Sequence, residues 1–131
     1  MSDENVRLLV VDDDPMQLEL VQRALGYEGF VVETASSLAS AVVALERFRP
    51  QIVLVDVNIP GMSRVDLRGF VESGSRSARV LLFSASDTGQ LRRLATEVGA
   101  HGWLSKSDEL SVLATRLRGV APGETTELRS S

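Results

Sequence analysis

Short apolar runs alternate along the chain with longer amphipathic stretches. The apolar runs cover residues 8–11, 30–32, 52–55, 80–83 and 103–104. They begin roughly 20 to 28 residues apart, which is enough chain for one strand and one returning helix. Continuous rather than alternating apolar runs predict strands that are buried on both faces, as in a central parallel sheet.

Helical patterns fill the intervals between these runs, with apolar positions spaced to bury one face of each helix. Asp14 followed by Pro15 is typical of a helix start, and Gly26 of its end. The other helices are expected from Ser36 or Ser37 to before Pro50, over 63–72, from Asp87 to Gly99, and from Ser107 or Asp108 to about 119. Five strands alternating with five helices predict an open α/β domain with helices on both faces of the sheet.

Length and composition favour one folded domain. The 131 residues are 44% hydrophobic, and we expect the domain to span 1–120, with 121–131 as a flexible tail or the start of a linker. The longest apolar run, 41–45, is far shorter than the ~20 residues that span a bilayer. The sequence has no cysteine and no secretory signal, which favours a cytoplasmic location without membrane contact. Its net charge of −4 argues against direct nucleic-acid binding by this domain.

Functional side chains follow the predicted strands. Asp12 and Asp13 come after the first strand and Asp56 after the third, while Ser84 ends the fourth and Lys106 follows the fifth. Because the carboxyl ends of parallel strands meet at one edge of a sheet, we expect these side chains to converge there.

The carboxylates predict a magnesium site. Asp12, Asp13 and Asp56 brought together repel one another, and Mg²⁺, which prefers oxygen ligands and few protein carboxylates, removes that repulsion. A carboxylate such as Asp56 beside a metal can also act as a nucleophile toward phosphorus. The turn predicted at 60–61, formed by Pro60 and Gly61, would let a backbone carbonyl near Asn58 face the cation.

A hydroxyl and a cation complete the predicted chemistry. The equatorial oxygens of a transferring phosphoryl group carry negative charge and need fixed donors. Ser84 can donate a hydrogen bond and Lys106 supplies a positive charge, while the small Ala85 leaves the approach to the site open.

In their order and spacing, these segments resemble the receiver domain of bacterial two-component response regulators. The resemblance covers about residues 6–119. Its matching segments are 8–15 (LLVVDDDP), 53–56 (VLVD), 60–62 (PGM), 81–85 (LLFSA), 99–100 (GA) and 103–106 (WLSK). It implies a flavodoxin-like, doubly wound parallel sheet of five strands in the order 2-1-3-4-5 with five helices, and a signalling domain rather than an enzyme.

The resemblance implies that Asp56 is the phosphoacceptor. The phosphoryl group would come from a sensor histidine kinase, a histidine phosphotransfer protein or a small phosphodonor. Asp13, Asp56 and the carbonyl of Asn58 would bind Mg²⁺ directly, and Asp12 would assist through water.

The resemblance also implies a conformational switch. Lys106 would pair with the phosphoryl oxygens, Ser84 would move to hydrogen-bond the phosphoryl group, and Trp103 would follow. The surface formed by the fourth helix, fifth strand and fifth helix would change, and a weak homodimer could use it.

Three residues depart from the family's usual pattern. Ser84 stands in place of the commoner threonine, Trp103 in place of tyrosine or phenylalanine, and Ser107 in place of a proline after the lysine. Trp103 and Ser107 keep open an alternative in which the domain is a scaffold that is not phosphorylated.

A second alternative is a phosphatase of the haloacid dehalogenase type, with Asp12 and Asp14 as its Asp-x-Asp signature. Such an enzyme needs another acidic pair on a strand beyond the lysine. Only one predicted helix and a polar segment follow Lys106, and Pro15 occupies the position after the Asp-x-Asp.

Overall fold

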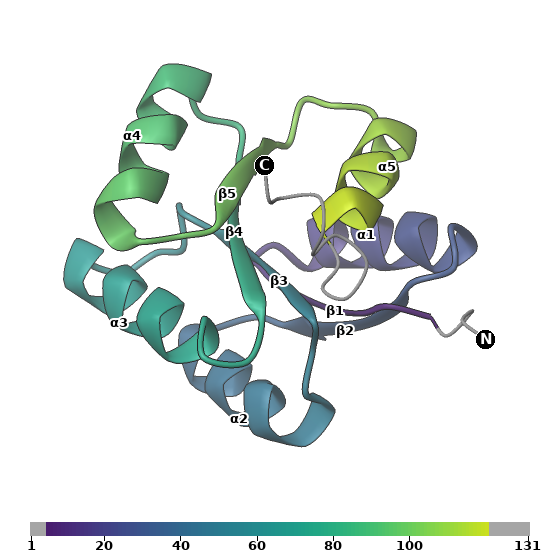
Figure 1. Cartoon of the computed structure of the whole chain (residues 1–131), viewed down its shortest axis with the longest axis horizontal. Coiled ribbons are helices and arrows are strands. Elements are labelled where there is room, and N and C mark those ends of the chain that lie inside the picture. The colour runs from purple at the N-terminus through teal and green to yellow at the C-terminus, as the bar shows by residue number, and fades with distance from the viewer. Residues whose placement is uncertain (1–4, 121–131) are drawn as a thin grey trace.

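The computed structural model describes residues 5–120, so the tail or linker predicted at 121–131 lies outside the described residues. Strands and helices alternate throughout (Figure 1). Their bounds are β1 (Arg7–Val11), α1 (Pro15–Tyr27), β2 (Val31–Ala35), α2 (Leu38–Phe48), β3 (Ile52–Asp56), α3 (Arg64–Gly74), β4 (Arg79–Ser84), α4 (Thr88–Val98), β5 (Gly102–Ser105) and α5 (Leu110–Val120).

The five strands form one parallel sheet in the order β2-β1-β3-β4-β5, which confirms the predicted topology. Helices α1 and α5 cover one face, and α2, α3 and α4 cover the other (Figure 1). The order of strands reverses between β1 and β3, so the chain leaves these two neighbouring strands toward opposite sides of the sheet. Crevices at such a reversal are where open α/β sheets place their functional groups.

The central strands explain the continuous apolar runs of the sequence. In β1, Leu9 and Val11 pack toward α2–α4, while Leu8 and Val10 pack toward α1 and α5. The residues of β3 from Ile52 to Val55 alternate in the same way, and each is fully buried. Both faces of these strands therefore bury apolar side chains, which anchors the loops that follow them.

The second strand, predicted from the apolar run 30–32 to end in Glu33 and Thr34, lies at Val31–Ala35. It is an edge strand, on which polar side chains reach solvent. Two other local predictions were wrong. The last helix begins at Leu110 rather than near Ser107 or Asp108, because a hydrogen-bonded turn precedes it. Asp87 precedes α4 but its side chain makes no capping hydrogen bond. The other helix ends agree with the predicted ones to within two residues.

Candidate functional site at the carboxyl edge of the sheet

Four adjacent strands deliver the predicted residues to one edge of the sheet. Asp12 follows β1, Asp56 ends β3, Ser84 ends β4 and Lys106 follows β5. Strand register sets their relative height, because Asp56 pairs with Phe83, one residue before Ser84. The topology therefore brings together residues that are as many as 94 positions apart in the sequence.

Three carboxylates form a compact cluster. Asp12, Asp13 and Asp56 each offer one oxygen, and these oxygens lie within 4.8 Å of one another. Asp12 is 1% exposed and Asp56 is 4% exposed, whereas Asp13 is open to solvent. Asp14 instead accepts a hydrogen bond from the amide of Met16 and caps α1, as its position before Pro15 predicted.

Lys106 compensates the two buried carboxylates. Its Nζ lies 2.7 Å from Oδ2 of Asp12 and 3.6 Å from Oδ2 of Asp56. The same ammonium lies 5.6 Å from the centroid of the Phe83 ring, which is buried beneath the site. Phe83 was predicted only as part of an apolar strand, and nothing in its sequence context indicates this contact.

Main-chain amides orient the other oxygens of the buried carboxylates. Oδ1 of Asp12 accepts a hydrogen bond of 3.0 Å from the amide of Asp14. Oδ1 of Asp56 accepts one of 3.1 Å from the amide of Asn58. Each carboxylate thus bonds to the amide two residues ahead, which fixes both the side chain and the start of the following loop.

Burial raises the pKa of Asp56 above its ordinary value of 3.8. The hydrogen bond from the amide of Asn58 and the charge of Lys106 lower this pKa, and the neighbouring Asp12 raises it. Desolvation is the largest of these effects, so the folded chain favours the protonated acid more than the unfolded chain does. In the absence of a bound cation, the ionised Asp56 carboxylate therefore destabilises the fold.

We expect this pKa shift to appear in the pH dependence of stability. The stabilising contribution of Asp56 is complete below its unfolded pKa and is lost as the pH rises through its raised folded pKa. Asn at this position does not titrate. Urea unfolding in chelator should therefore show the unsubstituted chain losing stability relative to Asp56→Asn from acidic to neutral pH. A constant difference between the two chains would contradict the shift.

Ser84 lies fully buried at the end of β4, with its hydroxyl bonded to neighbours in the following loop and to Asn58. Nδ2 of Asn58 donates to Oγ of Ser84 at 3.2 Å, so the Asn58 side chain faces this hydroxyl. Ala85 is exposed beside it. Oγ of Ser86 lies 3.0 Å from Oγ of Ser84. Ser86 was not among the residues predicted for the site.

Lys106 lies between two serines that are hydrogen-bonded in the same way as Ser84 and Ser86. Oγ of Ser105 lies 2.6 Å from Oγ of Ser107 and accepts a 3.1 Å hydrogen bond from the Ser107 amide. The main-chain amide of Lys106 also donates to the carbonyl of Ser84 at 2.9 Å. None of the peptide bonds among residues 5–120 is cis, so the bond after Lys106 is trans. These hydrogen bonds fix the loop although Ser107 stands where the family usually has proline.

The predicted turn after Asp56 is present. The amide of Met62 donates to the carbonyl of Ile59 at 3.1 Å, and Gly61 has a φ of 81°. Proline before a positive-φ glycine is typical of a type II turn. Pro60 and Gly61 are exposed, while Ile59 is buried and holds the loop on the molecule.

Trp103 lies outside the cluster of polar side chains. It pairs with Leu82 in the sheet, two residues before the Ser84–Ser105 pair. Its indole is half-buried and packs against the apolar layer beneath α2, α3 and α4.

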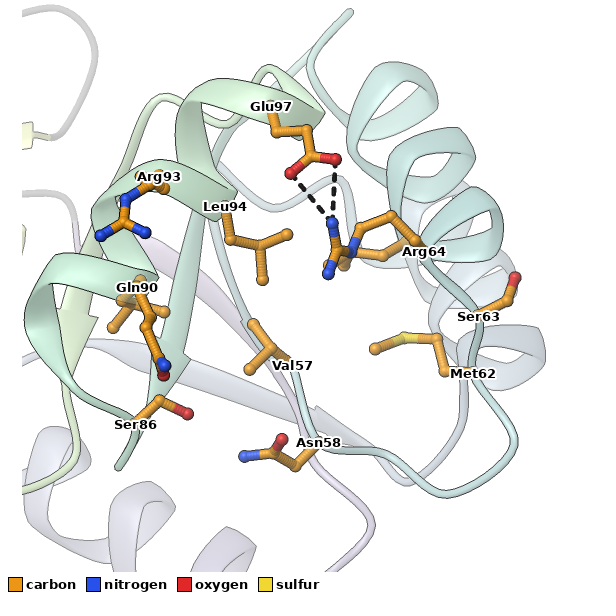
Figure 2. A pocket seen from close by; sticks show the side chains of 12 residues that line it. Val57, Asn58, Met62, Ser63, Arg64, Ser86, Gln90, Arg93, Leu94 and Glu97 are labelled. Atoms are coloured by element: carbon orange, nitrogen blue, oxygen red, sulfur yellow. Dashed lines mark hydrogen bonds and ion pairs between the residues drawn. The ribbon is translucent and has the colours of Figure 1, made fainter.

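A pocket of about 630 Å³ adjoins the site between α3 and α4 (Figure 2). Asn58 and Ser86 lie at one end of it. At the other end, Nη1 of Arg64 donates to both carboxylate oxygens of Glu97, at 2.9 and 2.8 Å. This ion pair connects the start of α3 to the end of α4.

Comparison with known proteins identifies the family of this chain. The sequence model of the response regulator receiver domain matches residues 8–118, nearly all of the described chain. The chain belongs to the response regulator receiver domain family. Receiver domains are signalling domains, and the resemblance predicted from the sequence is thereby confirmed.

Similar full-length proteins come from mycobacteria. The "Probable transcriptional regulatory protein TcrX" of Mycobacterium tuberculosis is 36% identical over 115 residues, covering 88% of this chain and 49% of that protein. The DNA-binding response regulator MtrA of Mycolicibacterium smegmatis is 33% identical over 112 residues, covering 86% and 49%. The receiver domain thus spans about half the length of the curated relatives it matches.

Solved structures show the same fold. The signal receiver domain of NarL from Mycobacterium tuberculosis has a TM-score of 0.77 at 32% identity, covering 92% of this chain and 99% of that one. The chemotaxis protein CheY4 of Vibrio cholerae has a TM-score of 0.78 at 25% identity, covering 89% of this chain and 99% of that one.

Within residues 5–120, no helix is long and apolar enough to cross a membrane.

Proposed function

We propose that this receiver domain accepts a phosphoryl group on Asp56 and uses it as a signal. The donor is the phosphohistidine of a sensor histidine kinase or histidine phosphotransfer protein, or a small phosphodonor. One observation carries the proposal: three carboxylates offer oxygens within 4.8 Å of one another, and the ammonium of Lys106 contacts two of these carboxylates. Such a site can both collect a divalent cation and compensate a developing phosphate charge.

The transfer step uses the carboxylate of Asp56 as the nucleophile. One of its oxygens forms a bond to phosphorus while the phosphorus–nitrogen bond of the phosphohistidine breaks. The electron pair of that bond leaves with the imidazole, and Asp56 becomes an acyl phosphate. Lys106 and the hydroxyl of Ser84 supply donors for the phosphoryl oxygens from the ends of β5 and β4.

The donor set fits Mg²⁺. Carboxylate and carbonyl oxygens are hard ligands, and the partly exposed cluster leaves room for the waters that Mg²⁺ retains. Asp13, Asp56 and the main-chain carbonyl of Asn58 would bind the ion, and Asp12 would assist through water. Bound there, the cation offsets the negative charge that phosphoryl transfer concentrates at this edge.

Phosphorylation is proposed to act on the surface formed by α4, β5 and α5. Ser84 moves toward the phosphoryl group, Trp103 adjusts its packing, and the two states differ in this surface. It is also the surface that we propose for a weak homodimer.

The domain itself, residues 1–120, is proposed to work in the cytoplasm as a signalling module that neither catalyses turnover nor binds nucleic acid.

Incubation with acetyl phosphate tests the proposal. With Mg²⁺, the mass of the intact protein should increase by one phosphoryl group, and EDTA should prevent the increase because the carboxylates then repel the donor. Phosphohistidine of a donor protein provides the second test. No increase with either donor would favour the scaffold alternative.

Magnesium should also stabilise the fold directly. An ion that binds only the folded chain raises the free energy of unfolding by RT ln(1 + [Mg²⁺]/Kd), which is about 2.7 kcal/mol at a hundredfold excess over Kd. Thermal unfolding should therefore occur at a higher temperature in Mg²⁺ than in EDTA. Asp13→Asn removes an exposed ligand and should reduce this difference, whereas an equal response to Mg²⁺ would remove Asp13 from the ligand set.

A further inference from the structure

The hydroxyl of Ser84 makes three contacts, none of them with Asp56. It lies 3.2 Å from Nδ2 of Asn58, 3.1 Å from the amide nitrogen of Ser86 and 3.0 Å from the hydroxyl oxygen of Ser86. The residue is fully buried, so water does not compete for these positions. Ser86 itself is partly exposed and lines the pocket between α3 and α4 (Figure 2).

These contacts use the entire hydrogen-bonding capacity of that hydroxyl. A serine hydroxyl has one proton to donate and two lone pairs that accept. The side-chain amide nitrogen of Asn58 and the main-chain nitrogen of Ser86 can only donate, so they occupy both lone pairs of the Ser84 oxygen. Either hydroxyl could donate in the Ser84–Ser86 contact. Because both lone pairs of the Ser84 oxygen already accept from nitrogen donors, we infer that Ser84 donates its proton to Oγ of Ser86.

We propose that Ser86 is a positioning residue that competes with the phosphoryl group for the hydroxyl of Ser84. The inference rests on the function proposed above, in which Ser84 donates to a phosphoryl oxygen. With its only proton held by Ser86, Ser84 can donate to that oxygen only after breaking this bond. The hydroxyl of Ser86 thus stabilises the unphosphorylated arrangement and opposes the switch.

The two serines differ in what they lose when this bond breaks. Ser86 is partly exposed, so water can replace its partner. Ser84 is buried, and its proton is left unsatisfied unless a phosphoryl oxygen accepts it. Removing the Ser86 hydroxyl therefore destabilises the unphosphorylated arrangement and leaves the phosphorylated one intact.

Binding of beryllofluoride with Mg²⁺, a stable mimic of the phosphoryl group, measures this competition. Ser86→Ala should bind beryllofluoride about three- to tenfold more tightly than the unsubstituted chain, which corresponds to one hydrogen bond. Ser86→Thr keeps a hydroxyl and should restore the original affinity. Ser77→Ala is the control, because Ser77 is exposed before β4, at the opposite edge of the sheet.

A double-mutant cycle separates this role from a general effect on the loop. If Ser86 acts through the hydroxyl of Ser84, Ser86→Ala should leave the affinity unchanged in a chain that already carries Ser84→Ala. An equal tightening in both backgrounds, or no tightening by Ser86→Ala alone, would overturn the inference while leaving the proposed function intact. If the unsubstituted chain does not bind beryllofluoride, the proposed function fails and this inference fails with it.

Discussion

Asp56→Asn should abolish phosphoryl incorporation from acetyl phosphate and from phosphohistidine. Asparagine matches the shape of aspartate, but its amide nitrogen is not a nucleophile and its oxygen carries no charge, so no acyl phosphate forms. The fold should persist, because Asp56 is buried and its neutral replacement removes a desolvated charge. Intact-protein mass spectrometry after incubation with donor and Mg²⁺ measures the result directly.

Asp14→Asn is the matched control for this experiment. Asp14 carries the same functional group close to the site, but it caps α1 through its hydrogen bond to the amide of Met16. Asparagine caps helices about as well as aspartate, so this variant should incorporate phosphate normally. Full incorporation by Asp56→Asn, or loss of incorporation by Asp14→Asn, would show that the phosphoacceptor is not Asp56 alone.

Much of the fold could be predicted because the central strands are apolar on both faces. Such runs in β1, β3 and β4 have no simpler interpretation than a sheet covered by helices on each side. Outside these central strands, the apolar pattern is less informative. Strand β2 has a neighbour on one side only, so Glu33 and Thr34 extend it without disturbing the core. The start of α5 depends on hydrogen bonds at Ser105, which no periodicity reveals.

The site was predictable only as far as strand ends determine it. The carboxylates, the hydroxyl and the ammonium could be placed at one edge because each of these residues ends or directly follows a predicted strand. The contacts that orient them depend on tertiary geometry: the hydrogen bond from Asn58 to Ser84 and the ring of Phe83 near Lys106 join residues from different strands. Ser86 went unnoticed because a serine in a loop carries no distinctive signal. Whether these residues have the proposed roles stays a prediction.

Lys106→Ala should have the second large effect, a loss of stability whose size depends on magnesium. In EDTA, the substitution leaves the buried carboxylates of Asp12 and Asp56 without their cation, only 2.7 and 3.6 Å from the lost ammonium. Removing one partner of a buried ion pair is strongly destabilising, and because the Lys106 side chain is 18% exposed we expect a loss of about 1–3 kcal/mol. Urea unfolding in EDTA measures this loss.

In Mg²⁺ the same variant should recover part of its stability. The ammonium of Lys106 donates a hydrogen bond to Oδ2 of Asp12 and repels a second cation. Removing this ammonium should therefore tighten Mg²⁺ binding by about tenfold. Phosphoryl incorporation should continue at a reduced level, because the acceptor and the metal ligands remain while one donor to the phosphoryl oxygens is lost. Arg23→Ala, which breaks an exposed ion pair with Glu19, controls for loss of a positive charge and should change neither property. Unaltered Mg²⁺ affinity in Lys106→Ala would show that this ammonium and the metal do not share the carboxylates, and the switch would then need a different source of charge compensation.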